Sequence, residues 1–215
     1  MSIPSRTGAT CLVLAPLFGV TSVLIERTVS GNAADQAAAF LSQSRLTQLG
    51  LTLNVVAAVL LIAGVVWLAW LTHDRSPRLA LTGGVLGVLG MIAVVMDGTF
   101  QMAGALMTSG LTAAQATALL EHVDSGGAFV VKPLSELADL GVILLAFAAL
   151  KIGVPRWVAV VLAAGVITEG IGFAIGIRYV AAAGFAASFV GYVVIEHTAF
   201  ATPRARATVM TARTA

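Results

Sequence analysis

Residues 51–72, LTLNVVAAVLLIAGVVWLAWLT, form a continuous apolar run without a charged side chain. At a rise of about 1.5 Å per residue, about 20 apolar residues cross a bilayer core of ~30 Å as one α-helix. The run is also too long and too continuous for an alternating strand of a membrane β-barrel. We therefore predict that residues 51–72 form a transmembrane helix.

Five other stretches share this character, and the six predicted spans are 8–25, 51–72, 79–100, 134–150, 157–177 and 179–195. The composition agrees, since 59% of the residues are hydrophobic and 10% are charged, against about 45–50% and about 25% in an average globular domain. So little polar surface excludes a water-soluble enzyme and a disordered protein. We expect an all-α integral membrane bundle of about six transmembrane helices. It forms a single domain over residues 1–215, with a flexible basic tail at 201–215.

The charged residues and the single cysteine exclude further classes. The net charge is only +2 and the basic residues are scattered, so no basic stripe could bind nucleic acid. Cys11 alone cannot form an internal disulfide or a cysteine metal cluster. The segments 121–124 and 196–197 contain Glu and His, but they fall on opposite faces of the membrane and lack HExxH spacing. We expect neither a metal nor an organic cofactor.

The distribution of Lys and Arg predicts the orientation in the membrane. With both termini in the cytoplasm, eight basic residues lie on the cytoplasmic side and four on the outer side, as the positive-inside rule requires. The cytoplasmic set is Arg6, Arg75, Arg78, Lys151, Arg156, Arg204, Arg206 and Arg213, and the outer set is Arg27, Arg45, Lys132 and Arg178. Trp67, Trp70 and Trp157 fall near the cytoplasmic boundary, where an interfacial aromatic belt belongs.

Two polar segments on the predicted outer side carry helix-start signals. Asn32 followed by Asp35 is typical of an N-cap with an acid in the first turn, ahead of AAAFLSQSRLTQL. Thr112 and Gln115 form a T-x-x-Q capping box. We expect short helices on the outer surface, which act either as lids or as ordered connecting loops.

Two carboxyl groups lie inside the predicted spans, where charge is costly. A charged side chain near the bilayer centre costs at least ~2.5–3.5 kcal/mol on insertion scales, so it usually faces protein or a water-filled cavity. Asp139 precedes Lys151 by 12 residues, about 18 Å, and Glu169 follows Arg156 by 13 residues, about 20 Å. Both basic residues mark the same boundary, so the two carboxyl groups reach matching depths. We predict that Asp139 and Glu169 form an intramembrane site.

Further polar side chains surround this pair. Glu136 precedes Asp139 by three residues and shares its side of the helix, while Asp97 and Gln101 stand near the outer end of their span. We expect Glu136 and Asp97 to support the chemistry, although a purely structural role is open for Asp97 and Gln101, since charge is cheap near the interface. Other hydrogen-bonding groups that could line a cavity are Thr99 and Ser188. We assign the substrate-binding role to Asn54, Gln101, Thr168 and Tyr192.

The paired carboxyl groups are compatible with three kinds of function. Apolar surroundings disfavour the charged form of a carboxyl group, so one of a close pair can remain protonated at neutral pH. Our leading hypothesis is a membrane-embedded cyclase or isomerase of a lipophilic small molecule, with Asp139 and Glu169 as proton donor and base or cation stabiliser. The same groups could bind and release protons in a small-molecule transporter or channel subunit. In a non-catalytic membrane partner or immunity protein, they would only hold helices together.

The motif Val154-Pro155-Arg156-Trp157 leads from a predicted inner loop into the fifth span. In this motif and in its alternation of spans and loops, the sequence resembles uncharacterised multispanning integral membrane proteins of GC-rich bacteria. Ten arginines against two lysines fit a GC-rich genome. The resemblance implies a multi-pass protein of the bacterial cytoplasmic (inner) membrane.

In size and architecture, the chain is also similar to small membrane-bound terpene cyclases. Those proteins are thought to use intramembrane carboxylates to protonate an isoprenoid epoxide or alkene. The similarity implies an isoprenoid as the lipophilic substrate. We expect membrane lipid and this small molecule as partners, no nucleic acid, and a monomer or homodimer.

Overall fold

The computed structural model describes residues 6–25, 32–42 and 45–213, and helices account for nearly all of these ranges. No strand occurs in this part of the chain. The helices are α1 (Arg6–Ile25), α2 (Ala33–Leu41), α3 (Arg45–His73), α4 (Pro77–Met107), α5 (Ala113–Ser125), α6 (Gly127–Ala149), the short 3₁₀ helix η1 (Leu150–Ile152), α7 (Arg156–Ala174) and α8 (Arg178–Arg213).

Six of these helices are long and apolar enough to cross a membrane, which confirms the predicted all-α membrane bundle. The spans are Arg6–Ile25, Arg45–His73, Pro77–Met107, Val131–Ile152, Arg156–Ala174 and Arg178–Phe200. The second and third helices are longer than the predicted runs 51–72 and 79–100. The extra turns of α4 pack against α2 and α5 through Met102 and Ala105. The start of α3 contacts α1, where the Ser22 hydroxyl donates a hydrogen bond to the Gly50 carbonyl oxygen at 2.9 Å. The last helix continues to Arg213, and the flexibility of the tail 201–215 stays a prediction.

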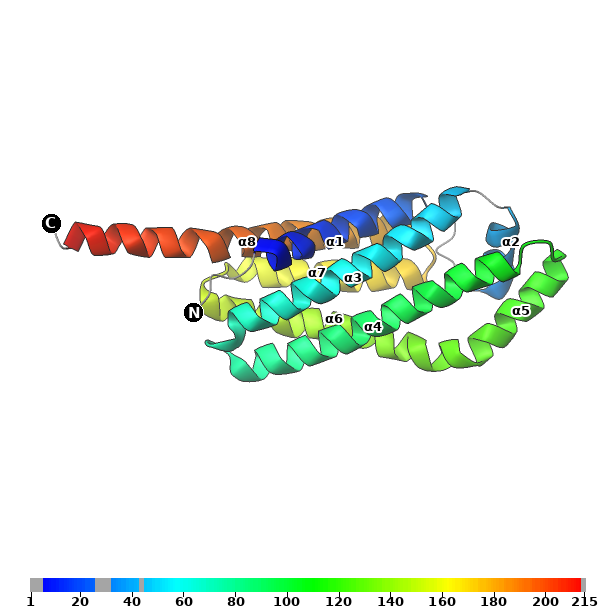
Figure 1. Cartoon of the computed structure of the whole chain (residues 1–215), viewed down its shortest axis with the longest axis horizontal. Coiled ribbons are helices and arrows are strands. Elements are labelled where there is room, and N and C mark those ends of the chain that lie inside the picture. The colour runs from blue at the N-terminus through cyan, green and yellow to red at the C-terminus, as the bar shows by residue number, and fades with distance from the viewer. Residues whose placement is uncertain (1–5, 26–31, 43–44, 214–215) are drawn as a thin grey trace.

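The spanning helices form a closed ring. α1 packs on α3, α3 on α4, α4 on α6, α6 on α7, α7 on α8, and α8 on α1. Figure 1 shows these helices running side by side, with α2 and α5 at one end of the bundle and α8 projecting from the other. We call the first the cap end. The second is the turn end, because α3 and α4 are joined there by the turn at residues 74–76.

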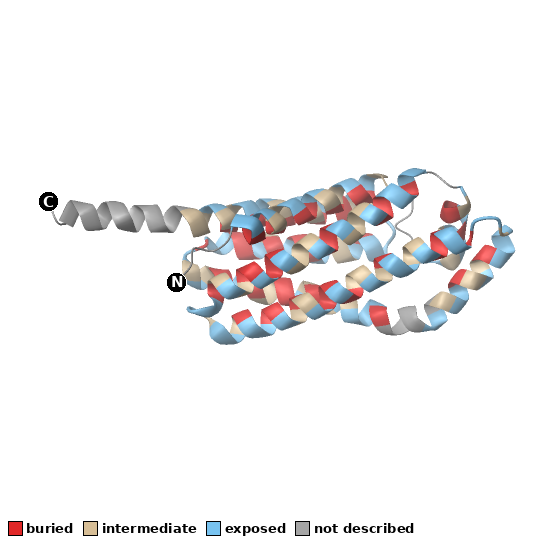
Figure 2. Ribbon diagram, in the orientation of Figure 1, coloured by how far each residue is buried: buried red, intermediate tan, exposed pale blue. Residues whose placement is uncertain are grey.

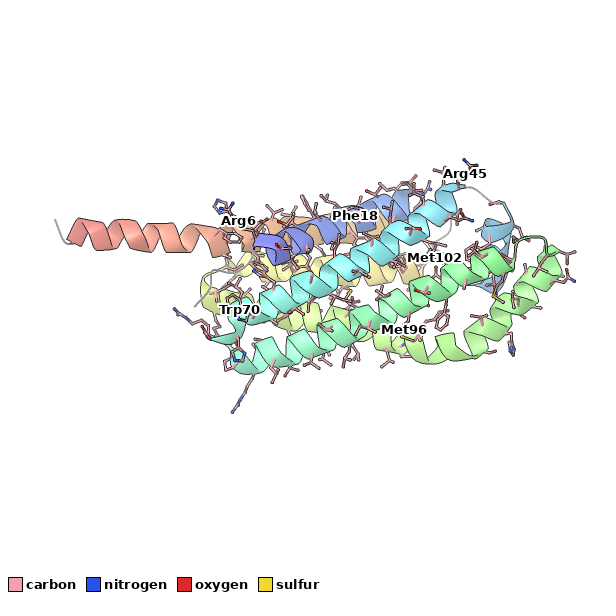
Figure 3. All side chains as sticks on the ribbon, in the orientation of Figure 1. Arg6, Phe18, Arg45, Trp70, Met96 and Met102 are labelled. Carbon is pink, nitrogen blue, oxygen red and sulfur yellow. The ribbon has the colours of Figure 1, made fainter. Side chains whose placement is uncertain are left out.

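The surface of the ring is apolar, as a lipid-facing surface must be. Figure 2 shows buried and exposed residues alternating along each long helix, so that every helix has an inner and an outer face. Large apolar side chains on the outer faces are strongly exposed, for example Leu81 at 64% and Val160 at 67%. In Figure 3, Arg6 and Trp70 lie toward the turn end and Arg45 lies at the cap end. Exposed apolar surface of this extent suits a hydrocarbon environment.

Glycines set the closest contacts in the ring. A Cβ atom on Gly141 of α6 would lie 2.2 Å from the backbone nitrogen of Gly87 on α4. A Cβ atom on Gly90 of α4 would lie 2.0 Å from the backbone nitrogen of Ala138 on α6. Small residues at such positions let helix backbones approach closely in a membrane, where packing drives association. The α4–α6 contact is therefore a glycine seam that fixes how both helices are rotated.

The two short helices form an ordered cap. Asn32 Oδ1 accepts a hydrogen bond from the Asp35 backbone N–H at 2.7 Å, and Thr112 and Gln115 make the complete capping box, both as predicted. Phe40 of α2 and Leu120 of α5 are buried in a second apolar cluster. One expectation is corrected: the helix that Asn32 starts ends at Leu41. Residues 45–49 instead open α3, because their apolar pattern continues into that span.

Candidate functional site

A small cavity lies inside the ring, and every spanning helix contributes to its wall. Its volume is about 80 Å³. The lining positions fall near the middle of the spans, such as Pro16 of α1, Met91 of α4 and Ser188 of α8. The polar side chains in the wall are Asn54, Asp139, Glu169, Ser188 and Tyr192.

The α6–α7 hairpin brings the two carboxyl groups together. Its turn passes through Gly153 in the left-handed region at φ 96°, a conformation that glycine adopts without steric cost. Asp139 and Glu169 then stand at similar distances from the turn, and both line the cavity. A Cβ atom on Gly170 would lie only 3.8 Å from Asp139 Oδ2, so the aspartate side chain rests against α7. The hairpin therefore brings both carboxyl groups to one cavity.

Helix α8 completes the polar wall with Ser188 and Tyr192, which are four residues apart and share one face. Their side chains are only 3% and 2% exposed. The Ser188 hydroxyl is buried without a hydrogen-bond partner, and Tyr192 interacts electrostatically with both Glu169 and Asp139. Buried hydroxyl groups normally have a partner, because leaving one unpaired costs about 1–3 kcal/mol. An unpaired hydroxyl in a cavity wall therefore points to a ligand or water as its partner.

The lining groups have a common chemical character. Carboxylate oxygens accept hydrogen bonds, and hydroxyl and amide groups can also accept them. No Lys, Arg or His is among the described residues that line the cavity. Within the described parts of the chain, no hydrogen bond joins Asp139 to Glu169. The two side chains therefore lack the direct hydrogen bond between helices that would be expected if they only held helices together.

Several predicted site residues lie outside the cavity. Glu136 is exposed, although its charge still reaches Asp139. Gln101 Nε2 donates a hydrogen bond to Asp97 Oδ2 at 2.6 Å, and this half-buried pair lies on α4 between the cavity and the cap end. Thr168 is half-buried but does not line the cavity. None of these four side chains is among the residues that line the cavity.

The two ends of the cavity differ in polarity. Toward the turn end it is closed by the main apolar core, in which Leu12, Leu68, Leu145 and Leu162 are at most 1% exposed. Toward the cap end, polar side chains of α4 and α6 follow, including the Asp97–Gln101 pair. Water and ions reach polar groups more easily than they cross a packed apolar layer. This conformation is therefore sealed toward the turn end.

The apolar part of the wall was not singled out in the sequence. It includes Leu61, Met91, Val94 and Phe185. These side chains resemble the many other apolar residues of the spans, so no local pattern distinguishes them. A periodic signal links some of them to polar positions, since Phe185 shares a helix face with Ser188 and Tyr192 at i, i+3 and i+7.

The cavity size limits what it can hold in this conformation. About 10–15 Å³ of such volume accommodates one water molecule, so about 80 Å³ holds several waters or one small ion. Pockets for drug-sized ligands measure about 300–1,000 Å³. An isoprenoid does not fit unless the helices separate.

The ring and its cavity define a class, a multi-pass helical membrane protein with a carboxyl-lined cavity inside the bundle. No protein-family model, no curated protein and no solved structure matches this chain. Function is therefore inferred from the residues and geometry of the site.

Proposed function

We propose that this protein is a proton-coupled transporter that exchanges protons for a small monovalent cation at Asp139 and Glu169. The observation that carries the proposal is the cavity: two carboxyl groups and an unpaired buried hydroxyl face a space of about 80 Å³ inside the ring. Ion and substrate sites of membrane transporters typically lie near the bilayer midplane, between the helices that move. Carboxyl groups at that depth are typical of proton relays.

Exchange follows from the chemistry of the wall. A carboxyl group that loses its proton becomes negative, and in an apolar surrounding it needs a positive partner. A small cation supplies that charge, so proton and cation compete for one site. The acceptor atoms of Asn54, Ser188 and Tyr192 complete its coordination, and the rings of Phe185 and Tyr192 suit a cation as well. Release on the other side requires the apolar core at the turn end to open.

The proposal is tested with the full-length protein in liposomes that contain a pH-sensitive dye and an acidic lumen. Sodium, potassium and methylammonium ions are added outside in turn. We expect one of these cations to raise the luminal pH faster than in protein-free liposomes, because each cation that enters releases a proton. If none does so in vesicles with correctly folded protein, cation exchange is wrong.

A membrane-embedded acid–base enzyme is the second candidate. The favouring observation is the apolar side of the cavity wall, which includes Met91 and Phe185. A lipophilic substrate would contact this side, with Asp139 and Glu169 as proton donor and base. Mass spectrometry of organic extracts separates the candidates. An enzyme changes a molecule into an isomer or product, whereas a transporter only moves it between cells and medium.

We also propose that both termini face the cytoplasm of a bacterial inner membrane, with the cap end outside. The excess of basic residues at the turn end supports this orientation. A reporter fused after Ala215 that is active only outside the cytoplasm should stay inactive. An active reporter would reverse the orientation.

A further inference from the structure

A second hollow lies on the outside of the ring, between α3 and α4 near the turn end. Its volume is about 550 Å³ and almost all of its lining is apolar. The side walls are large side chains that point away from the bundle, including Trp70 at 51% exposed, Leu81 at 64% and Val85 at 49%. The hollow is therefore an open groove on the lipid-facing surface.

The groove exists because its floor is made of small residues. A Cβ atom on Gly84 would lie 2.8 Å from Cβ of Ala69, so the two helices almost touch there. Ala80, which is 1% exposed, continues the floor toward the turn. Large side chains on both sides of this close contact leave a channel between them, which runs along the helices.

The groove ends in a positively charged group. His73 belongs to its lining. Arg75 lies in the turn that follows α3, and Arg78 lies in the first turn of α4. Both arginines are exposed, and no ion pair to them occurs within the described ranges. Asp74 is the single acid of the turn, so two Arg against one Asp leave a formal charge of +1.

Arg78 is aligned with the groove. It precedes Leu81, Val85 and Leu89 by three, seven and eleven residues, and these positions share one face of an α-helix. Ser76, the N-cap of α4, makes no side-chain capping bond, and Pro77 follows it. The positive end of the helix dipole therefore adds to the arginine charges at the mouth of the groove.

We propose that this groove binds an anionic phospholipid of the adjoining leaflet. One acyl chain lies between α3 and α4, and the phosphate group lies among Arg75, Arg78 and His73. The complementarity is specific: an apolar channel of this volume suits a hydrocarbon chain, and the cationic mouth suits the anionic headgroup. Trp70 stands beside the mouth, at the depth where indole rings meet headgroups. This site is separate from the cavity inside the ring and does not depend on its function.

The test is the number of lipids retained by the full-length protein in native mass spectrometry, after exchange into detergent with phosphatidylglycerol or phosphatidylcholine of equal chain length. We expect wild type to retain phosphatidylglycerol preferentially. Each arginine near an anionic headgroup contributes about fivefold in affinity, so Arg75→Gln or Arg78→Gln should weaken phosphatidylglycerol binding about fivefold and the double variant about thirtyfold. Phosphatidylcholine binding should change much less, because its headgroup carries no net charge.

Two further variants test whether lipid binding depends on the groove and on its own arginines. Arg156→Gln removes an exposed arginine at the start of α7, at the same end of the bundle, and should leave phosphatidylglycerol binding at the wild-type level. Val85→Phe narrows the groove and should weaken the binding of both lipids. Equal retention of the two lipids by wild type, or an equal loss in Arg156→Gln, would overturn the proposal. A dimer that Val85→Phe converts to a monomer would instead identify a second copy as the occupant.

Discussion

We expect Asp139→Asn and Glu169→Gln each to lower cation-coupled proton flux in liposomes by at least about 100-fold. The amide retains the size of the side chain but cannot release a proton or supply a negative charge. Removing one partner of a buried ion pair costs about 3–5 kcal/mol, which corresponds to a factor between about 10² and several thousand in binding. The cation therefore loses its site even though the cavity keeps its shape.

The matched control is Glu196→Gln, the same chemical change on α8 outside the cavity. We expect this variant to retain wild-type flux. Thermal unfolding of all three variants in detergent reports whether the bundle is intact, and the two cavity variants should unfold at or above the wild-type temperature. Wild-type flux in both Asp139→Asn and Glu169→Gln would assign the carboxyl groups a structural role. A lipid product that disappears in both variants would favour the enzyme.

We expect Gly141→Ala to destabilise the bundle strongly. The added Cβ would lie 2.2 Å from the Gly87 nitrogen and 2.7 Å from the Gly83 carbonyl oxygen. Both are backbone atoms, so no rotamer change relieves the contact and α6 must move away from α4. Overpacking of a close contact costs about 1–3 kcal/mol, and the shift also moves Asp139, two residues away. We expect a lower unfolding temperature in detergent together with reduced flux.

Gly170→Ala is the control for this change, and only the unfolding temperatures of the two variants are compared. Its Cβ would meet no atom closer than 3.8 Å, which is an ordinary contact. Alanine also favours the helix over glycine by about 1 kcal/mol, so this variant should unfold at or above the wild-type temperature. An equal loss of stability in both variants would show that the glycine seam does not hold α4 against α6.

Properties that depend on position along the chain could be predicted from the sequence. The spans follow from the length of apolar runs, and both helix caps follow from local residue patterns. The matching depths of Asp139 and Glu169 follow from the constant rise of an α-helix. The end of α2 at Leu41 was not predicted, because the residues on both sides of the boundary between α2 and α3 favour helix formation.

Rotation about each helix axis was decided only by the tertiary structure. Glu136 and Asp139 are three residues apart, yet one is exposed and the other lines the cavity. Ser188 lines the cavity because α8 packs closely against α7. A Cβ atom on Gly165 of α7 would lie 2.8 Å from the Ser188 Oγ atom. In a chain this apolar, hydropathy differs too little between the sides of a helix to determine which side faces the interior of the bundle. Close contacts between small residues such as Gly87 and Gly141 do so, and such contacts exist only once the helices are assembled.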